Sequence, residues 1–481
     1  MKKFIEIIKK KWLRDTTKTI LLVAILFAAY IGINVLVQNV EIKDIDVTED
    51  QLFTLSEQSK NQARNVNEDI KIYLIGVEEN TSLVDLVKQY TNENEKITYE
   101  VIPDVQDRAD LKSKYNITDE TQVIIMETAS KNKIITFDEL YTYDYTTYQQ
   151  IDISEETLTN GIMDLTIAEK PKIYFLTGHN EYAINADMTI LKAYLENEVN
   201  TVETLDLLVK DAVPEDASLL VIASPQKDFL DREVELITNY INNGGKILWM
   251  NDPSFTGTTY PNMQKLLDLF GAKFDEGIIL EQDADKMALQ SPNYIIPNIT
   301  STQATKDIAT DGGILLINSS KITLAEDTKL EELNVASQVI LSTGETALFR
   351  KDVSNTSTGK IESDEEGSFI LGAKLTKTLD DNKEAVMYVL ANNFFVVDYP
   401  ITIGNSQVYP IQFYNNKDYI LNTIAELTNR EDTISIRKDT GVVTYTATEA
   451  QDRNIKIIIS IIPAFIIIVG IAVWIYRRIK K

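Results

Sequence analysis

The chain has 481 residues, with 73 acidic and 47 basic side chains and a formal net charge of −26. It contains no cysteine and a single histidine, which excludes disulfides, thiolate metal sites, cysteine nucleophiles and multi-histidine metal sites. A surface this acidic repels the phosphate backbone of nucleic acids, which excludes nucleic acid as a partner. The content of 44% hydrophobic residues is typical of a folded protein, and the length predicts two or three domains.

The chain begins with a basic leader, residues 1–18, which contains seven Lys or Arg. An uncharged apolar run follows from Thr19 to Val37, and a helix of this length nearly crosses a hydrocarbon core of about 30 Å. We interpret it as an uncleaved signal anchor, a transmembrane helix over 19–38. A cleaved signal peptide is the alternative, but no small-x-small cleavage site follows the run.

A second uncharged apolar run, Ile457–Tyr476, precedes a tail in which four of five residues are Lys or Arg. It predicts a transmembrane helix over 455–476 and a cytoplasmic tail over 477–481. Because basic residues flank the outer end of each run, the positive-inside rule places both termini in the cytoplasm. The bulk of the chain is then extracytoplasmic. A buried core helix is the alternative for each run.

Between the two runs, residues 39–150 predict an extracytoplasmic α/β domain. Ser56 can cap a helix that begins near Glu57, and the following patterns alternate in the order β-α-β-α-β-β. The end of this domain is rich in tyrosine, which predicts an exposed edge strand or linker; stacking on sugars or peptides is the alternative. These residues are Tyr141, Tyr143, Tyr145 and Tyr148.

From 151 to 290 the pattern becomes regular, with strands that alternate with helices of about ten to fifteen residues. It predicts crossover units and a doubly wound parallel sheet similar to flavodoxin and amidotransferase folds. The pair Gly244-Gly245 predicts a helix end in the left-handed conformation. Residues 291–385 predict a β-rich insertion, and residues 386–454 a strand and a helix that complete the sheet.

The first strand of this sheet ends in the sequence GHNE, which contains the histidine. In open α/β sheets, ligands bind beyond the carboxyl ends of the strands, so polar residues that follow several strands predict one cleft. The candidates for ligand or partner binding are Gly178, His179, Asn180, Glu181, Asp228, Asp252 and Asn392. A histidine beside a carboxylate can act as a general base, so an extracytoplasmic hydrolase or transferase is one hypothesis.

Motifs that such chemistry would use are missing from the sequence. It has no G-x-S-x-G nucleophile elbow, no G-x-G-x-x-G turn and no Walker phosphate loop. A tight turn in which His179 and Glu181 bond to the loop backbone is the preferred explanation of GHNE, ahead of ligand binding and of catalysis. We therefore expect no catalytic residue, no cofactor and no metal.

Five stretches of the chain resemble the GldG-like auxiliary components of ABC transporters, a family named for bacterial gliding motility. In chain order they read DVTEDQLFTLSEQS, EETLTNGI, KPKIYFLTGHNE, LITNYINNGGKILWMNDP and LNTIAELTNREDTISIR. The resemblance spans most of residues 19–476. It implies a membrane-anchored protein that works with an ABC ATPase and a permease and has no ATP site of its own. It also implies a sheet domain of class I amidotransferase type without the catalytic triad.

Two departures from the family pattern concern the candidate cleft. Where members typically read Gly-His-Gly-Glu, this chain has Asn180 in place of the second glycine. Where they usually carry Gly-Asp-Ser-Asp-Phe, it reads Leu-Ala-Asn-Asn-Phe over 390–394, so Asn392 and Asn393 are uncharged. This loss of charge weakens a metal or acid–base role.

These observations together predict a non-catalytic, two-pass auxiliary subunit of an ABC-type export complex in a bacterial cell membrane. Its expected partners are the ABC ATPase, the permease, the lipid bilayer and either a substrate or an envelope component. Two alternatives stay open: a hydrolase that uses His179 and Glu181, and a stand-alone adhesion module that uses the tyrosine-rich stretch.

Overall fold

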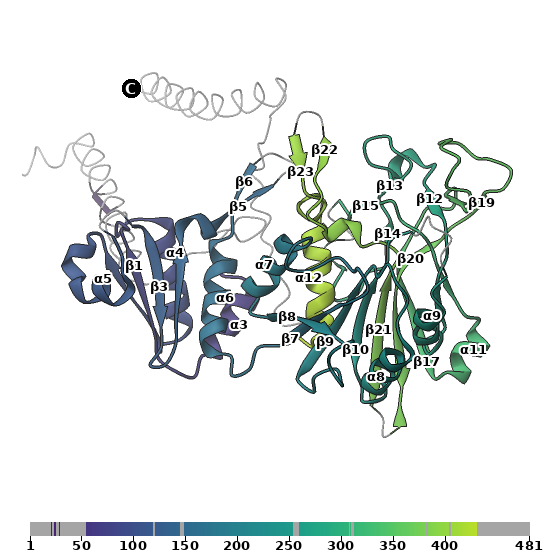
Figure 1. The fold of residues 1–481 in the computed structure, drawn as a ribbon. Coiled ribbons are helices and arrows are strands. Elements are labelled where there is room, and N and C mark those ends of the chain that lie inside the picture. Colours follow the sequence, from purple (N-terminus) through teal and green to yellow (C-terminus); the bar gives the residue numbers. More distant parts are fainter. Residues whose placement is uncertain are drawn as a thin grey trace, which may run out of the picture. The chain divides into compact units, whose positions relative to one another are not determined.

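The computed structural model describes residues 54–430 with short gaps, together with four helical positions nearer the N-terminus. The gaps are 119–120, 145–148, 254–258, 307, 309–311, 381–382 and 404–405, and the four positions are Leu21, Ala24, Ile25 and Ala28. The chain divides into a unit Met1–Ser56 and a unit Glu57–Lys481. The helices and strands drawn and labelled in Figure 1 from α3 onward belong to the second unit.

Among the described residues, no helix combines the length and the apolarity that crossing a bilayer requires. The predicted spans over 19–38 and 455–476 lie outside the described residues, apart from the four isolated positions of the first. The predicted leader over 1–18 and tail over 477–481 lie outside them as well.

The first α/β domain is built on a four-stranded sheet in the order β2-β1-β3-β4. β1 pairs parallel with β2 and antiparallel with β3, and β3 and β4 form a hairpin. Its elements are α3 (Glu57–Arg64), β1 (Ile70–Ile75), α4 (Ser82–Glu93), β2 (Ile97–Ile102), η1 (Val105–Arg108), α5 (Ala109–Tyr115), β3 (Val123–Glu127) and β4 (Asn132–Thr136). The predicted order of strands and helices is confirmed, because each element shows its own apolar period.

Helix α6 (Ser154–Thr166) packs on this first domain through a buried polar cluster. Ser59 Oγ donates to Glu155 Oε1 at 2.6 Å and lies 3.0 Å from Thr159 Oγ1, which is 2.6 Å from the Tyr90 hydroxyl. The cluster joins α3, α4 and α6. The first domain therefore extends through α6, which the sequence pattern assigned to the second domain.

The second domain contains a ten-stranded sheet whose parallel part has the order β8-β7-β9-β10-β21. Counted along the chain this is the order 2-1-3-4-5 of a doubly wound sheet. The strands are β7 (Lys172–Thr177), β8 (Thr201–Asp206), β9 (Ala217–Ala223), β10 (Lys246–Met250) and β21 (Glu384–Leu390).

Helices cover both faces of the parallel strands (Figure 1). α7 (Thr189–Asn197) and α12 (Asn416–Leu427) pack in one apolar core, and α8 (Asp231–Asn242) and α9 (Pro261–Asp268) pack in the core of the other face. Gly244, which follows the C-cap residue of α8, has a φ of +89°, the left-handed conformation that the sequence predicted at this helix end. Both faces are buried, which explains the nearly continuous apolar runs of these strands.

Much of the predicted insertion continues this sheet. β20 pairs antiparallel with β21, and β16 and β17 pair antiparallel with β20. β20 thereby pairs with the edge of β21 that would otherwise have no neighbouring strand. The added strands, with helix α11 (Asp327–Glu332), are β11 (Ala272–Phe274), β14 (Asn298–Ile299), β16 (Ile322–Leu324), β17 (Val335–Ser342) and β20 (Ile370–Thr378).

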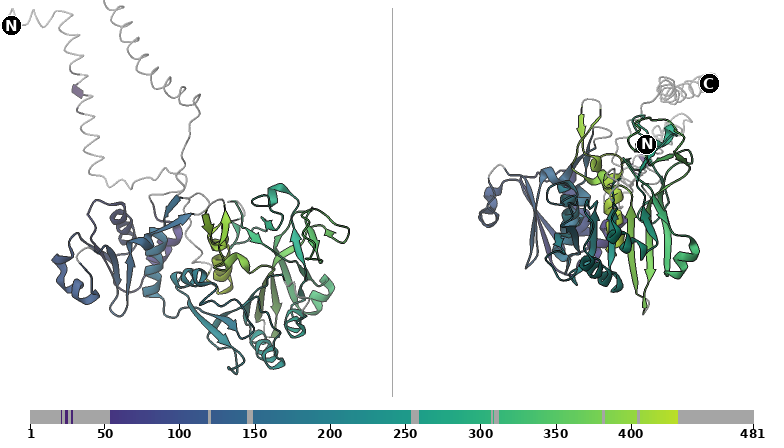
Figure 2. Two further views of the ribbon diagram at one scale, coloured as in Figure 1. Left: turned by 45° about the horizontal axis from the view of Figure 1, so that its top comes forward. Right: turned by 45° about the vertical axis from the view of Figure 1, so that its right-hand side comes forward.

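The described residues also form small sheets of two or three strands. The elements are β5 (Tyr141–Asp144) with β6 (Gln149–Asp152), β12 (Ile278–Leu280) with β18 (Leu348–Arg350) and β19 (Glu365–Glu366), β13 (Tyr294–Ile295) with β15 (Leu316–Ile317), and β22 (Ile401–Ile403) with β23 (Ser406–Val408). The β22–β23 hairpin projects away from the sheet (Figure 2). The exposed strand predicted from the tyrosines is present as β5, where Tyr141 and Tyr143 are exposed; Tyr145 and Tyr148 lie outside the described residues.

Candidate functional site

The carboxyl ends of β7 and β9 meet where the strand order reverses. β7 continues to β8 on one side, whereas β9 continues to β10 on the other, so this is the topological switch point at which open sheets bind ligands. His179 O accepts hydrogen bonds from Gln226 N at 2.8 Å and Lys227 N at 3.2 Å. Tyr182 N donates to Ala223 O at 3.0 Å. The loops after the two strands are thus bonded together.

His179 lies between two carboxylates from different elements. The residue is 4% exposed, with Nε2 at 3.0 Å from Glu233 Oε2 and Nδ1 at 3.5 Å from Glu181 Oε1. Phe229 meets the imidazole in an edge-on contact, with 5.0 Å between the ring centroids. The contact with Glu181 is long for a hydrogen bond, and Nδ1 has no hydrogen-bond partner among the described residues.

Each carboxylate also fixes the backbone of a loop. Glu181 Oε2 accepts from His179 N at 2.7 Å, which closes the turn after β7. Glu233 Oε2 accepts from Leu230 N at 2.9 Å and so caps the first turn of α8. The two side chains are 2% and 1% exposed. We call Glu181, His179 and Glu233 the buried triad.

The triad favours a protonated imidazole. The pKa of His179 is raised above its ordinary value, first by the Glu181 carboxylate that faces Nδ1 and then by the charge of Glu233, while burial opposes the shift. The shorter contact is nevertheless the one with Glu233. A cation between two anions, each also bonded to backbone, is a compact internal ion cluster that joins the loop after β7 to α8.

The turn around His179 uses left-handed backbone on both sides. Gly178 has a φ of +123°, and a Cβ there would lie 3.1 Å from Leu208 Cδ1. Asn180 has a φ of +58°, and asparagine is among the few residues other than glycine that adopt this conformation readily. Asn180 therefore supports this left-handed turn without a glycine.

Asp252 joins the ends of three strands. Its Oδ1 accepts from Asn393 N at 2.6 Å and from Phe394 N at 3.0 Å, beyond β21. Its own N–H donates to Ser224 Oγ, beyond β9, at 2.6 Å. Burial raises the pKa of Asp252 to about 6, and the two backbone hydrogen bonds oppose the shift. Asp252 organises the edge of the sheet from within.

Two other candidates are occupied inside the fold. Asp228 accepts from Asn262 N and Met263 N, each at 3.0 Å, and thereby caps the N-terminus of α9. Asn392 is fully buried and donates to Ile317 O at 2.7 Å. Both side chains lie at the predicted edge, but their polar atoms serve neighbouring backbone.

Sequence reasoning missed Glu233 and the backbone of Ser224. Glu233 stands three residues after Leu230, the position at which a glutamate caps a helix, and that signal could have identified it. Ser224 has a φ of +51° and is 1% exposed. No local pattern marks this left-handed serine, because its conformation is held by the contact with Asp252.

The buried triad is poorly arranged for chemistry on an outside molecule. A proton that leaves either ring nitrogen of His179 meets Glu181 or Glu233, and all three side chains are buried. Within the described part of the chain, no group of three His, Cys, Asp or Glu residues is arranged to hold a metal ion. The triad can store a proton and fix two loops.

Apolar side chains are exposed beside the triad. Leu208, Val209 and Leu230 are 43%, 75% and 56% exposed; we call them the edge patch. Arg232 Nη1 donates to Leu207 O at 3.1 Å, which joins the loop after β8 to the start of α8. The edge patch therefore sits on loops that the fold holds together.

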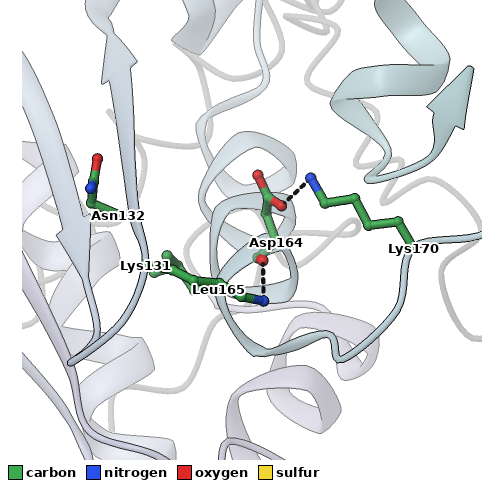
Figure 3. Close-up of a pocket in the computed structure, with 5 residues that line it drawn as sticks. All are labelled: Lys131, Asn132, Asp164, Leu165 and Lys170. Carbon is green, nitrogen blue, oxygen red and sulfur yellow. Dashed lines mark hydrogen bonds and ion pairs between the residues drawn. The ribbon is translucent and has the colours of Figure 1, made fainter.

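A cavity of about 380 Å³ lies away from this edge, in the first domain. Its lining residues are Lys131, Asn132, Asp164, Leu165 and Lys170 (Figure 3). Lys170 Nζ is 2.5 Å from Asp164 Oδ1, and Lys131 Nζ donates to Ile167 O at 2.8 Å. These lysines are already engaged within the chain, and none of the predicted site residues lines the cavity.

Comparison with known proteins identifies one family. A family model described as an ABC-type uncharacterized transport system matches residues 170–423, which include every predicted site residue. No curated protein matches the chain.

Solved structures give only distant likenesses. The "mmIFT52 N-terminal domain" is 14% identical, with coverage of 53% of this chain and 97% of that one and a TM-score of 0.39. A glutamine amidotransferase from Thermotoga maritima is 9% identical, covering 55% and 96%, with a TM-score of 0.28. The exo-β-1,4-mannosidase Op5Man5 from Opitutaceae bacterium strain TAV5 is 11% identical, covering 74% and 49%, with a TM-score of 0.27.

Proposed function

The chain belongs to the ABC-type uncharacterized transport system family, whose model matches more than half of its residues, and from this premise we propose a non-catalytic, membrane-anchored auxiliary subunit. Within the family, the order of the matching stretches favours the GldG-like branch. The proposed partners are an ABC ATPase and a permease, and the sheet domain would bind a substrate or an envelope component.

The observation that supports the non-catalytic role is that the members of the buried triad contact one another and leave no ring nitrogen of His179 facing an outside molecule. Both ring nitrogens of His179 face carboxylates of the same chain, and the residue is 4% exposed. A general base must come within about 3 Å of the proton that it removes, and these neighbours occupy that space. The edge patch adds exposed apolar side chains to this edge, next to exposed polar ones such as Asn180 and Lys227, and exposed apolar surface favours contact with another molecule.

The proposed anchoring rests on the apolar runs at 19–38 and 455–476 and on the basic residues beside them. It places both termini in the cytoplasm and the two α/β domains outside. Reporter fusions test it: a reporter that is active only in the cytoplasm should work at both termini. An externally active C-terminal fusion would overturn the two-pass arrangement.

The edge patch is the proposed contact surface for a substrate or an envelope partner, since it lies at the switch point of the sheet. A photo-crosslinking amino acid at Val209 tests this in intact cells. We expect a covalent adduct from Val209 and none from Leu289, a matched control that is 52% exposed on a different surface loop. Equal labelling at the two positions, or no adduct at Val209, would remove the edge patch from the proposal.

A further inference from the structure

β22 and β23 form a hairpin that projects from the sheet domain (Figures 1 and 2). Ile401 pairs with Val408, and both are buried in a small apolar core beneath the hairpin. Thr402 pairs with Gln407 on the other face, and both are exposed. Among the described strands, β22 and β23 pair only with each other. The hairpin therefore presents an outer face and two strand edges to any molecule that approaches it.

Both ends of the hairpin are fixed to the domain. Before β22, the Asp398 carboxylate accepts hydrogen bonds from Thr189 N and Thr189 Oγ1, each at 2.6 Å. After β23, the Asn416 side chain accepts from Leu315 N at 2.8 Å and donates to Pro410 O at 2.9 Å. A contact element that is already held in position loses little conformational freedom when it binds. The hairpin is therefore preorganised for contact.

The hairpin and the residues after it carry no charge. Residues 399–416 contain no Asp, Glu, Lys, Arg or His, although 25% of the whole chain is charged. Asp398, which precedes them, directs its carboxylate to the N-terminus of α7. Tyr399 and Tyr409 are 68% and 36% exposed. An acidic molecule thus presents an uncharged surface with two tyrosines; we call Tyr399, Thr402, Gln407 and Tyr409 the hairpin surface.

This composition is typical of the centre of a protein–protein interface. Such centres are enriched in tyrosine and depleted of aspartate, glutamate and lysine, and tyrosine is among the residues that contribute most to binding. The open edges of the hairpin add backbone groups that pair with another protein. A partner face without charged side chains would leave no charge unpaired in the contact.

Two other occupants fit the hairpin surface less well. A second copy of the chain would bring a net charge of −26 against another of −26, and such repulsion keeps proteins monomeric. Lipid hydrocarbon offers no hydrogen-bond partner, and open strand edges do not occur in it. A protein that is embedded in the membrane avoids both difficulties.

We propose that the hairpin surface docks on an uncharged patch on the extracytoplasmic face of the permease. This inference rests on the proposed function, which supplies the permease as a partner. The edge patch is formed by other loops, after β8 and at the start of α8. One subunit would then contact the permease through the hairpin and a substrate or an envelope component through the edge patch.

Photo-crosslinking in intact cells tests the hairpin surface. p-Benzoylphenylalanine replaces Tyr399 in the full chain, and its adducts are identified by mass spectrometry. We expect an adduct with the multi-span permease. The same amino acid at Thr328, an exposed position on α11, is the matched control and should give no adduct with the permease. Adducts of Tyr399 with lipid alone, with a second copy of the chain alone, or with nothing would overturn the proposal.

An added charge gives a second test. Gln407→Glu places a carboxylate on the exposed face of β23, so the fold should tolerate it, but the contact would bury it unpaired. The amount of permease that co-elutes with the chain should fall about tenfold or more. Gln106→Glu, the same change at an exposed position of η1, should leave co-elution unchanged.

The two tests separate the hairpin surface from the proposed function. Normal co-elution of the permease with Gln407→Glu, together with no permease adduct from Tyr399, would show that the chain docks through a different surface, and the proposed function would stand. A permease that is absent even from the unmodified chain would contradict the proposed function, and the docking surface with it.

Discussion

His179 depends for its charge on two carboxylates that come from different elements. Glu181 belongs to its own turn, whereas Glu233 belongs to α8. Removing one member of a buried ion cluster leaves the others desolvated and unpaired, which costs about 3–5 kcal/mol. The histidine that looked like a catalytic base in the sequence is therefore explained as a bridge between two loops.

The first prediction concerns the pH dependence of stability. The folded pKa of His179 is raised, so its stabilisation is fully present below the unfolded value of about 6.5 and is lost as pH rises through the folded pKa. Urea unfolding between pH 6 and pH 9 should show this decline. His179→Gln should lower the free energy of unfolding by about 3 kcal/mol at pH 6 and flatten the profile.

Lys210→Gln, at an exposed position in the loop after β8, serves as the control and should keep the decline. A His179→Gln chain that retained the full pH profile would show that another group causes it.

The second prediction concerns the turn at Asn180. Because its φ is +58°, Asn180→Gly should leave stability nearly unchanged. Asn180→Val should cost about 1–2 kcal/mol, since a β-branched side chain collides with the backbone in this conformation. Thermal unfolding of the two variants checks the difference, and equal stabilities would argue against the left-handed turn.

At the scale of elements, local sequence patterns were sufficient to predict where helices and strands lie but not to predict which strands pair with each other. α4 is found at Ser82–Glu93 as its apolar spacing predicts, and α3 begins at the predicted Glu57. By contrast, the pairing of β17 with β20 joins segments far apart in sequence, and no local pattern encodes it. The same reason explains why α6 was assigned to the second domain, although it packs on the first.

The site was predicted to a similar degree. The parallel order placed the loops after β7, β9, β10 and β21 at one edge, and the structure brings Gly178, His179, Asn180 and Asp252 there. Glu233 was missed because its contact with His179 depends on how α8 returns to the sheet. The side chain of Asp228 was read as a cleft residue, yet its oxygens are bonded to the first turn of α9.

The third prediction tests that helix cap. Asp228→Ala removes the acceptor of two backbone N–H groups and should destabilise the domain by about 1 kcal/mol, the usual effect of losing a cap. Asp231→Ala is a matched control, because its salt bridge with Lys265 is exposed and is expected to contribute less than about 1 kcal/mol. Chemical denaturation of both variants gives the comparison; a larger loss at Asp231 would contradict the capping role.

At the scale of the whole molecule, the matched region, residues 170–423, coincides with the sheet domain. The basic ends of the chain and its acidic remainder are the basis of the proposed arrangement, with the α/β domains outside and both termini in the cytoplasm. Together with the closed triad, this arrangement favours a subunit that contacts partners over one that turns over a substrate.

The central claim, membership of an ABC-type transport complex, is tested most directly by the composition of the particle that contains the full chain. The tagged chain is extracted from its native membrane in mild detergent, separated by size exclusion, and its co-eluting proteins are identified by mass spectrometry. We expect an ATPase with a phosphate-binding loop and a multi-span permease to co-elute in constant ratio with the chain. Elution of the intact chain with neither subunit, at a size that accounts for the chain alone, would contradict the proposed function.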